Sequence, residues 1–245
     1  MIVEVCVDSA ESAVAAEKGG AARVELCCAL LEGGLTPSAG AIALARKSLS
    51  IGLNVIIRPR GGDFLYSGPE HEVMLRDIDA AKEIGADGVV IGALTASGDV
   101  DVARTRELTE RARPMSVTFH RAFDMTRDPF AALEELAGVG VDRVLTSGQE
   151  ESAMEGLDLL RELVARAGDR IGILVCGNLT EKNIGRIARE TKANELHVTG
   201  FVEAESGMTF RNPRVYMGGL LRPPEYIRAV TDADRISALV RRALP

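Results

Sequence analysis

The chain has 245 residues, with 29 basic and 36 acidic side chains, a formal net charge of −7 and 46% hydrophobic residues. This acidic balance excludes a basic nucleic-acid-binding face, and the hydrophobic content excludes disorder. The sequence contains no uncharged apolar run of roughly 18 residues, so we expect no membrane span. The opening segment Met1–Cys6 lacks the basic region of a signal peptide. Four cysteines without a Cys-x-x-Cys pair indicate reduced thiols, so we expect a cytoplasmic protein.

Short β-rich apolar runs alternate with amphipathic helical patterns along the whole chain. We predict eight strands, at Ile2–Val7, Arg23–Cys27, Asn54–Arg58, Gly88–Ile91, Ser116–His120, Arg143–Thr146, Ile171–Val175 and Glu195–Val198. Helical patterns lie between them, for instance at Glu70–Ile84, Asp101–Ala112, Pro129–Ala137 and Ser152–Ala167. Regular alternation predicts a parallel sheet, and this number of units in a chain of this length is typical of a (β/α)₈ barrel. A doubly wound open sheet is the alternative that the same alternation permits.

A weak internal repeat favours the closed barrel. Gly20, Gly85 and Gly140 each precede a predicted strand by three residues, where a glycine can end a helix in the left-handed conformation. Lys192 begins a fourth copy without the glycine. These copies precede the even-numbered strands, so we expect one α/β domain spanning residues 1–245. Two long loops follow strands, at Pro59–Pro69 and Thr199–Leu221, and a last helix is expected over residues 224–243.

Two neighbouring strands carry the same pattern, Val-Glu-Val-Cys and Val-Glu-Leu-Cys. Because side chains alternate along a strand, the valines and Leu26 face the helices, and Glu4, Cys6, Glu25 and Cys27 face the barrel interior. A buried glutamate needs a partner, and the arginines expected at the same end of the barrel are Arg58, Arg60 and Arg121. The glutamates either form a buried ionic layer with those arginines or face a substrate or ion.

The paired cysteines raise the question of a metal site. Neighbouring strands lie about 4.8 Å apart, so Cys6 and Cys27 can present two sulfurs to one soft ion such as Cu(I). Two small buried core residues are the alternative, since cysteine is among the most buried residue types. Cys176 ends a third strand at the same end of the barrel, and Cys28 is expected to point away.

Two histidines lie on predicted strands. His120 closes the fifth strand, where it can act as an acid, base or ligand, or can simply be hydrogen-bonded to Asp124 or a neighbouring carboxylate. His197 on the eighth strand is also expected to face inward. The loops after the sixth and seventh strands, which contain Ser147 and Gly177, open helices and so are candidates for phosphate binding, unless Thr180 merely caps the following helix.

Several segments together resemble the CutC-type copper homeostasis family. They are Glu4–Asp8, Arg23–Cys27, Arg58–Tyr66, Thr118–Met125, Leu145–Gly148 and Phe210–Asn212. The resemblance extends from the first strand to about Gly218. It implies a cytoplasmic (β/α)₈ barrel, often a homo-oligomer, that is associated with copper tolerance and binds Cu(I) through Cys6 and Cys27. The loop after the seventh strand departs from the glycine-rich turn usual in that family.

Two functions follow from the side chains described above, and a third, a purely structural or partner-binding role, is suggested by the loop Thr199–Leu221 alone. The first is a copper homeostasis protein that binds Cu(I) at Cys6 and Cys27, with no nucleic-acid or membrane partner. The second is a barrel enzyme acting on a small phosphorylated or carboxylated metabolite, because Arg and His side chains at one barrel end suit an anionic ligand. In that case Glu4, Glu25 and His120 would be catalytic, and the anion-binding set would be Arg58, Arg60, Arg121, Asp124, Ser147 and Gly177.

Overall fold

The computed structural model describes residues 1–218 and 224–244 and forms a closed barrel of parallel strands. Neighbouring strands follow chain order from β1 to β8, and β8 pairs with β1 to close the barrel. The strands are β1 Ile2–Val7, β2 Arg23–Leu26, β3 Gly52–Ile56, β4 Gly88–Ile91, β5 Ser116–Phe119, β6 Arg143–Thr146, β7 Gly172–Val175 and β8 Glu195–Val198. The predicted (β/α)₈ barrel is confirmed, and the open sheet is excluded.

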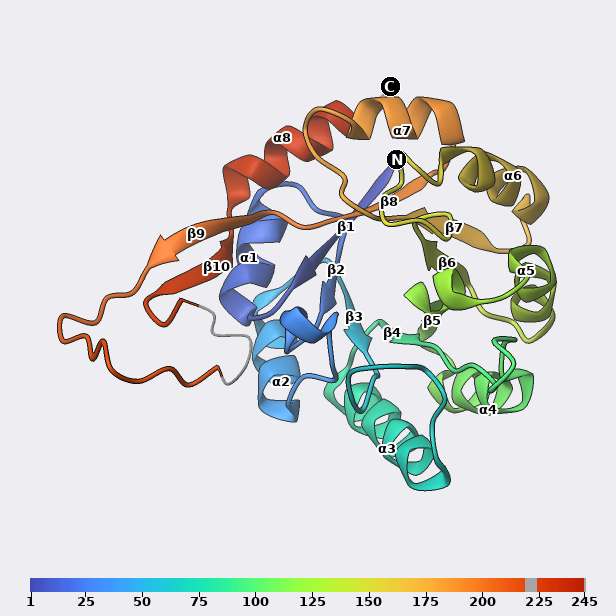
Figure 1. The fold of residues 1–245 in the computed structure, drawn as a ribbon, viewed down its shortest axis with the longest axis horizontal. Helices are drawn as coiled ribbons and strands as arrows, with labels where there is room; N and C mark the ends of the chain where they lie inside the picture. Colours follow the sequence, from blue (N-terminus) through green and yellow to red (C-terminus); the bar gives the residue numbers. More distant parts are fainter. Residues whose placement is uncertain (219–223, 245) are drawn as a thin grey trace.

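The helices surround the barrel, as Figure 1 shows in a view into its interior. They are α1 Ala10–Lys18, α2 Ala39–Ser48, α3 Gly68–Ile84, α4 Val102–Ala112, α5 Pro129–Gly138, α6 Leu157–Ala167, α7 Ile184–Thr191 and α8 Ala233–Ala243. Two short 3₁₀ helices, η1 Leu30–Glu32 and η2 Arg121–Met125, follow β2 and β5. The outward faces of the strands, such as Val5 and Val24, are fully buried against these helices and form the main apolar core.

The turns before the even-numbered strands have the predicted left-handed backbone. Gly20, Gly85 and Gly140 have φ values of 94°, 92° and 82°. Lys192, which replaces the glycine in the fourth copy, has a φ of 58° and ends α7 in the same conformation. The turn geometry is therefore repeated even where the residue is not.

The third strand begins and ends two residues earlier than expected, while the other predicted strand boundaries agree within one residue. Gly52, which a sequence pattern does not mark as a strand residue, pairs with Arg23 of β2. The ladder ends before Arg58 because the backbone N–H of Arg58 donates to the side chain of Thr36. Because the ladder ends here, the Arg58 side chain reaches the loops after β2 and β3, where it donates to the carbonyls of Glu32 and Gly62.

Two helices begin several residues later than expected. Helix α6 begins at Leu157, because residues 152–156 form a turn in which Gly156 packs directly against Gly148. The expected C-terminal helix over residues 224–243 begins only at Ala233, after Asp232, whose side chain accepts a hydrogen bond from the Arg235 N–H.

The residues before α8 form a strand, not a helix. Strand β10, Ile227–Thr231, pairs antiparallel with β9, Phe201–Glu205, within the segment expected as the loop Thr199–Leu221. Residues 219–221 of that loop lie outside the described residues. Figure 1 shows the β9–β10 pair extending away from the barrel on the side of α1, and the Thr231 N–H donates to Ser12 of that helix.

Candidate functional site

A cavity of about 250 Å³ opens at the carboxyl ends of the barrel strands. This is the end where (β/α)₈ barrels carry their functional residues. The lining mixes polar and apolar side chains, and its residues are Cys6, Glu25, Cys27, Glu32, Gly33, Ile56, Arg58, Phe64, His120, Arg121, Leu145 and His197.

Cys6 and Cys27 lie together at the bottom of this cavity. Because β1 and β2 pair with Cys6 opposite Glu25, the next inward residue of β2, Cys27, is placed close to Cys6. Their sulfurs are 3.8 Å apart, and both thiols are buried. A carboxylate oxygen of Glu25 lies within 4.8 Å of both sulfurs. The predicted inward orientation of these residues is confirmed, and the three form a group able to hold a metal ion.

The sequence did not identify the main partner of this group, which is His197 of β8. The His197 Nδ1 lies 2.8 Å from the Glu4 carboxylate, and its Nε2 lies 3.6 Å from that of Glu25. Burial opposes a charge on the ring, but hydrogen bonds with Cys6 and Glu4 raise the pKa of His197 well above its usual value. Alternation along β8 correctly placed His197 inside the barrel, but the sequence carries no signal for its partners.

Glu4 lies in an ionic layer below the cavity. Burial raises its pKa, but the hydrogen bond with His197 and the charge of Arg23 outweigh burial and hold that pKa at about 2. Arg23 pairs with Glu4, and it donates to Glu195 at 2.6 Å. Asn54 donates to the same Glu4 carboxylate at 3.1 Å. Glu4 therefore belongs to a buried ionic layer, which was one of the two expected alternatives. The expected partners Arg58, Arg60 and Arg121 are wrong, because the arginine beside Glu4 is Arg23.

Those arginines point elsewhere because each follows its strand into a loop. Arg58 donates to the backbone carbonyls of Glu32, Gly34 and Gly62. Arg60 is paired with Glu70 at 2.6 Å and with Asp63 at 3.0 Å, and it does not line the cavity. Arg121 is paired with Asp124 at 2.8 Å. None of the three forms an ion pair with Glu4 or Glu25.

The pKa values of the two cavity thiols and of Glu25 are shifted in different directions. The hydrogen bond with Cys27 and the hydrogen bond and charge of His197 outweigh burial, which raises the pKa of Cys6, and lower that pKa to about 6. The same Cys6 contact and burial raise the pKa of Cys27 well above its usual value. Burial is also the main reason that the pKa of Glu25 rises to about 8. At neutral pH the pair therefore holds one thiolate, beside a protonated Glu25 and a charged His197.

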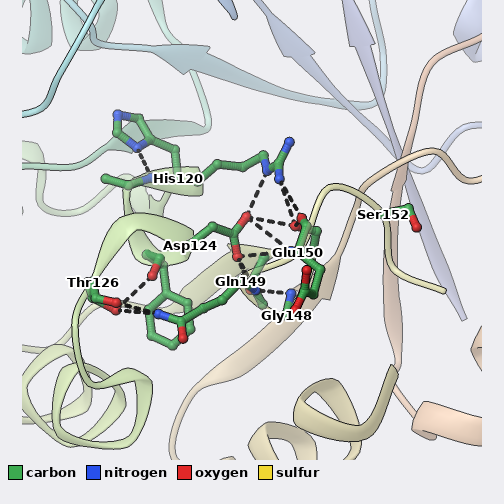
Figure 2. Close-up of polar contacts among 12 residues, drawn as sticks. His120, Asp124, Thr126, Gly148, Gln149, Glu150 and Ser152 are labelled. Carbon is green, nitrogen blue, oxygen red and sulfur yellow. Dashed lines mark hydrogen bonds and ion pairs between the residues drawn. The ribbon is translucent and has the colours of Figure 1, made fainter. Parts of the chain in front are cut away.

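The loop after β6 is held by hydrogen bonds to Asp124. Figure 2 shows hydrogen bonds around the Asp124 carboxylate, which accepts from several groups of this loop, and Arg121 donates to the same carboxylate. These donors are the Thr146 hydroxyl, the Ser147 hydroxyl and N–H, and the Gln149 N–H. The single proton of the Ser147 hydroxyl is shared between Asp124 and the Glu150 carbonyl, and the same hydroxyl accepts from Arg121 at 2.7 Å. These contacts fix the position of Arg121 at the cavity wall.

Gly177 supports the same loop from the side of β7. Its φ is 99°, and a side chain there would meet the Cβ of Ser147 at 2.7 Å. Its carbonyl accepts from the Ala153 N–H. Neither Gly177 nor Ser147 lines the cavity. Thr180 lies before α7, whose capping position is Asn183.

His120 is not bonded to Asp124 or to any cavity carboxylate. Its Nδ1 accepts a hydrogen bond from the backbone N–H of Ala122 at 3.1 Å, the contact drawn in Figure 2. Burial and the nearby charge of Arg58 lower the pKa of His120 to about 3, so the ring is neutral. The expected alternative of a hydrogen bond to a carboxylate is therefore wrong.

The two remaining cysteines lie apart from the Cys6–Cys27 pair. The Cys28 thiol donates to the carbonyl of Thr36, outside the cavity. This agrees with the expectation that Cys28 points away from Cys6 and Cys27. Cys176 is buried with Leu145 and Leu174 in a separate apolar group inside the barrel, and burial raises its pKa well above the usual value. Within residues 1–218 and 224–244, no helix has the length and apolar character needed to cross a bilayer.

The fold and this cavity define a (β/α)₈ barrel protein with a buried dithiol at the carboxyl end of its strands. The model of the CutC family matches residues 1–202, and the chain therefore belongs to that family. This result confirms the family resemblance noted in the sequence.

Similar proteins support the same assignment. The copper homeostasis protein cutC homolog of Mus musculus is 51% identical over 238 residues, covering 97% of this chain and 88% of the mouse protein. A family protein CutC of Mesorhizobium japonicum is 48% identical and covers 99% of this chain and 94% of its own length. The crystal structure of the putative copper homeostasis protein CutC from Streptococcus agalactiae superposes with a TM-score of 0.77 at 33% identity. It covers 80% of this chain and 97% of the Streptococcus chain.

Proposed function

We propose that this chain is a cytoplasmic copper homeostasis protein that binds Cu(I) between Cys6 and Cys27. The observation that carries the proposal is the pair of buried sulfurs 3.8 Å apart, one of them held as a thiolate by its neighbours. Thiolate sulfur is the donor that Cu(I) prefers. Relatives named copper homeostasis proteins supply the biological context.

The spacing of the sulfurs supports a bent rather than a linear site. With metal–sulfur bonds of about 2.3 Å, a linear arrangement would need sulfurs about 4.6 Å apart, whereas the observed spacing subtends roughly 110° at an ion. A bent site has room for a third donor, and the Glu25 carboxylate is within reach of both sulfurs. The same donor set suits Zn²⁺, so Zn²⁺ is the competitor to test.

The test is an anaerobic Cu(I) titration in competition with bicinchoninate. We expect the wild type to withdraw one Cu(I) per chain from the competitor and the C6S/C27S variant to withdraw none. Cys28→Ser is the matched control, because Cys28 is a cysteine outside the cavity, and it should behave as the wild type does. Unchanged Cu(I) uptake by C6S/C27S, or Zn²⁺ displacing bound Cu(I), would overturn the proposal. Size-exclusion chromatography with light scattering tests the homo-oligomer that the family resemblance implies.

A second candidate is an enzyme acting on a small phosphorylated or carboxylated metabolite. The observation that favours it is the cavity itself, which at about 250 Å³ is much larger than one metal ion. Of the residues expected to be catalytic, Glu25 and His120 line this cavity, whereas Glu4 lies below it and is engaged by Arg23. Glu25, protonated at neutral pH, is therefore suited to act as an acid. A crystal soaked with phosphate or a carboxylate, showing no ordered anion in the cavity, would count against this candidate.

A further inference from the structure

One wall of the cavity carries a histidine N–H donor without an acceptor. Because the His120 Nδ1 accepts from the Ala122 N–H and the ring is neutral, the ring proton is on Nε2. The ring is held in place between Phe64, whose centroid is 5.0 Å away, and Gly92, where any side chain would meet the ring at 2.3 Å. His120 is 4% exposed, and its Nε2 has no hydrogen-bond partner among the described residues. Figure 2 shows the ring apart from the hydrogen-bonded loop around Asp124.

Arg58 supplies a charge and a second free donor on the same wall. Its side chain is buried, and its guanidinium lies 5.2 Å from the Phe64 ring centroid. The two terminal nitrogens donate to backbone carbonyls, but the Nε has no partner in the described part of the chain. Those carbonyls are neutral, and Arg58 forms no ion pair with any described carboxylate. A buried charge without a counter-charge is costly, and an anion on this wall would supply that counter-charge.

The size and charge of the cavity restrict that anion. The volume of about 250 Å³ is at the lower end for small-molecule sites, so the ligand has few heavy atoms. One arginine charge and one neutral N–H donor match a singly charged group. Glu32, which also lines the cavity, carries an acidic side chain that disfavours a dianion such as phosphate. The apolar side chains of Ile56 and Leu145 also line the cavity and suit a short hydrocarbon chain.

We propose that the His120–Arg58 wall of the cavity binds the carboxylate of a small monocarboxylic acid. The His120 Nε2–H and the Arg58 Nε–H donate to the carboxylate oxygens, and the rest of the molecule extends over Ile56 toward the dithiol. This binding site goes beyond the copper role and requires neither bound copper nor turnover.

The test uses the full chain, labelled with ¹⁵N-histidine, and straight-chain carboxylates from acetate to hexanoate as probes. Titration should shift the buried His120 Nε2–H resonance, and calorimetry should give the affinity. Butyramide, a neutral isostere of butyrate, and inorganic phosphate should both bind at least tenfold more weakly than butyrate.

Variants distinguish direct contact from a general effect on the fold. Asn at position 120 can retain the acceptor for the Ala122 N–H but lacks the Nε2–H, so His120→Asn should weaken butyrate binding at least tenfold. Arg58→Lys keeps the charge but removes the Nε–H, and it serves as a second variant whose folding is checked by circular dichroism. His71→Asn is the matched control, because His71 pairs with Glu107 outside the barrel. The proposal fails if folded wild type binds no carboxylate at millimolar concentration. It also fails if phosphate binds more tightly than butyrate, or if His120→Asn and His71→Asn bind butyrate equally.

Discussion

Burial of a neutral His120 makes the stability of the fold depend on pH in a defined direction. The pKa of His120 falls from 6.5 to about 3 because of burial and the charge of Arg58. A group whose pKa is lowered on folding contributes stability above its unfolded pKa, and that stability is lost as the pH falls. Between pH 6.5 and pH 3 the unfolded chain therefore binds a proton that the folded chain does not. The expected slope is about 1.4 kcal/mol per pH unit.

Other groups titrate in the same range, so the wild type alone does not isolate this effect. Glu25, whose pKa rises to about 8, is protonated in the folded state and gains stability as the pH falls toward its unfolded value. The contribution of Glu25 opposes that of His120. The comparison must therefore be made with a variant that keeps Glu25 and removes only the titration of His120.

His120→Asn is that variant, because an asparagine can still accept from the Ala122 N–H. Urea unfolding at pH 7.5 and pH 4.5 gives the free energy of unfolding of both proteins at each pH. We expect the wild type to lose about 2.6 kcal/mol more than His120→Asn between these two values. The substitution also loses packing of the imidazole ring, but that loss lowers the free energy of unfolding equally at both pH values and so cancels in the comparison. Parallel pH profiles for the two proteins would refute the reasoning, since they would show that His120 titrates normally in the fold.

Three further predictions follow from other parts of the barrel. Arg23→Met leaves the buried carboxylate of Glu4 without its arginine, so the free energy of unfolding, measured by urea denaturation, should fall by about 3–5 kcal/mol. A fall of less than about 1 kcal/mol would contradict the ionic layer. Asp124→Ala removes the acceptor that holds the loop after β6, so amide hydrogen exchange in that loop should accelerate at least tenfold while the exchange of β1 stays unchanged. Cys6 should react with iodoacetamide as a thiolate, with its rate rising as the pH rises through about 6, measured by mass spectrometry; a midpoint above pH 8 would show an ordinary thiol.

The sequence determined the architecture because the architecture depends on local, repeated signals. Alternating apolar periods fixed the eight strands of the barrel to within two residues. The period of two along a strand also settled which side chains face inward, and so placed Cys6, Cys27 and His197 inside the barrel. The segment Ile227–Thr231 was misjudged because its strand is stabilised by pairing with Phe201–Glu205, a partner more than twenty residues away in the chain.

Only the tertiary structure decided which inward side chains meet. Arg23 occupies the place beside Glu4 that the sequence assigned to Arg58, Arg60 and Arg121, because strand register sets the neighbours of Glu4. His197 reaches the same carboxylate from the last strand, 193 residues away, once the barrel closes. Inward direction is a property of one strand, whereas contact depends on the register between strands. The sequence alone therefore indicated a polar, thiol-bearing barrel interior, and the closure of the barrel decided its pairing and left His120 and Arg58 with free donors.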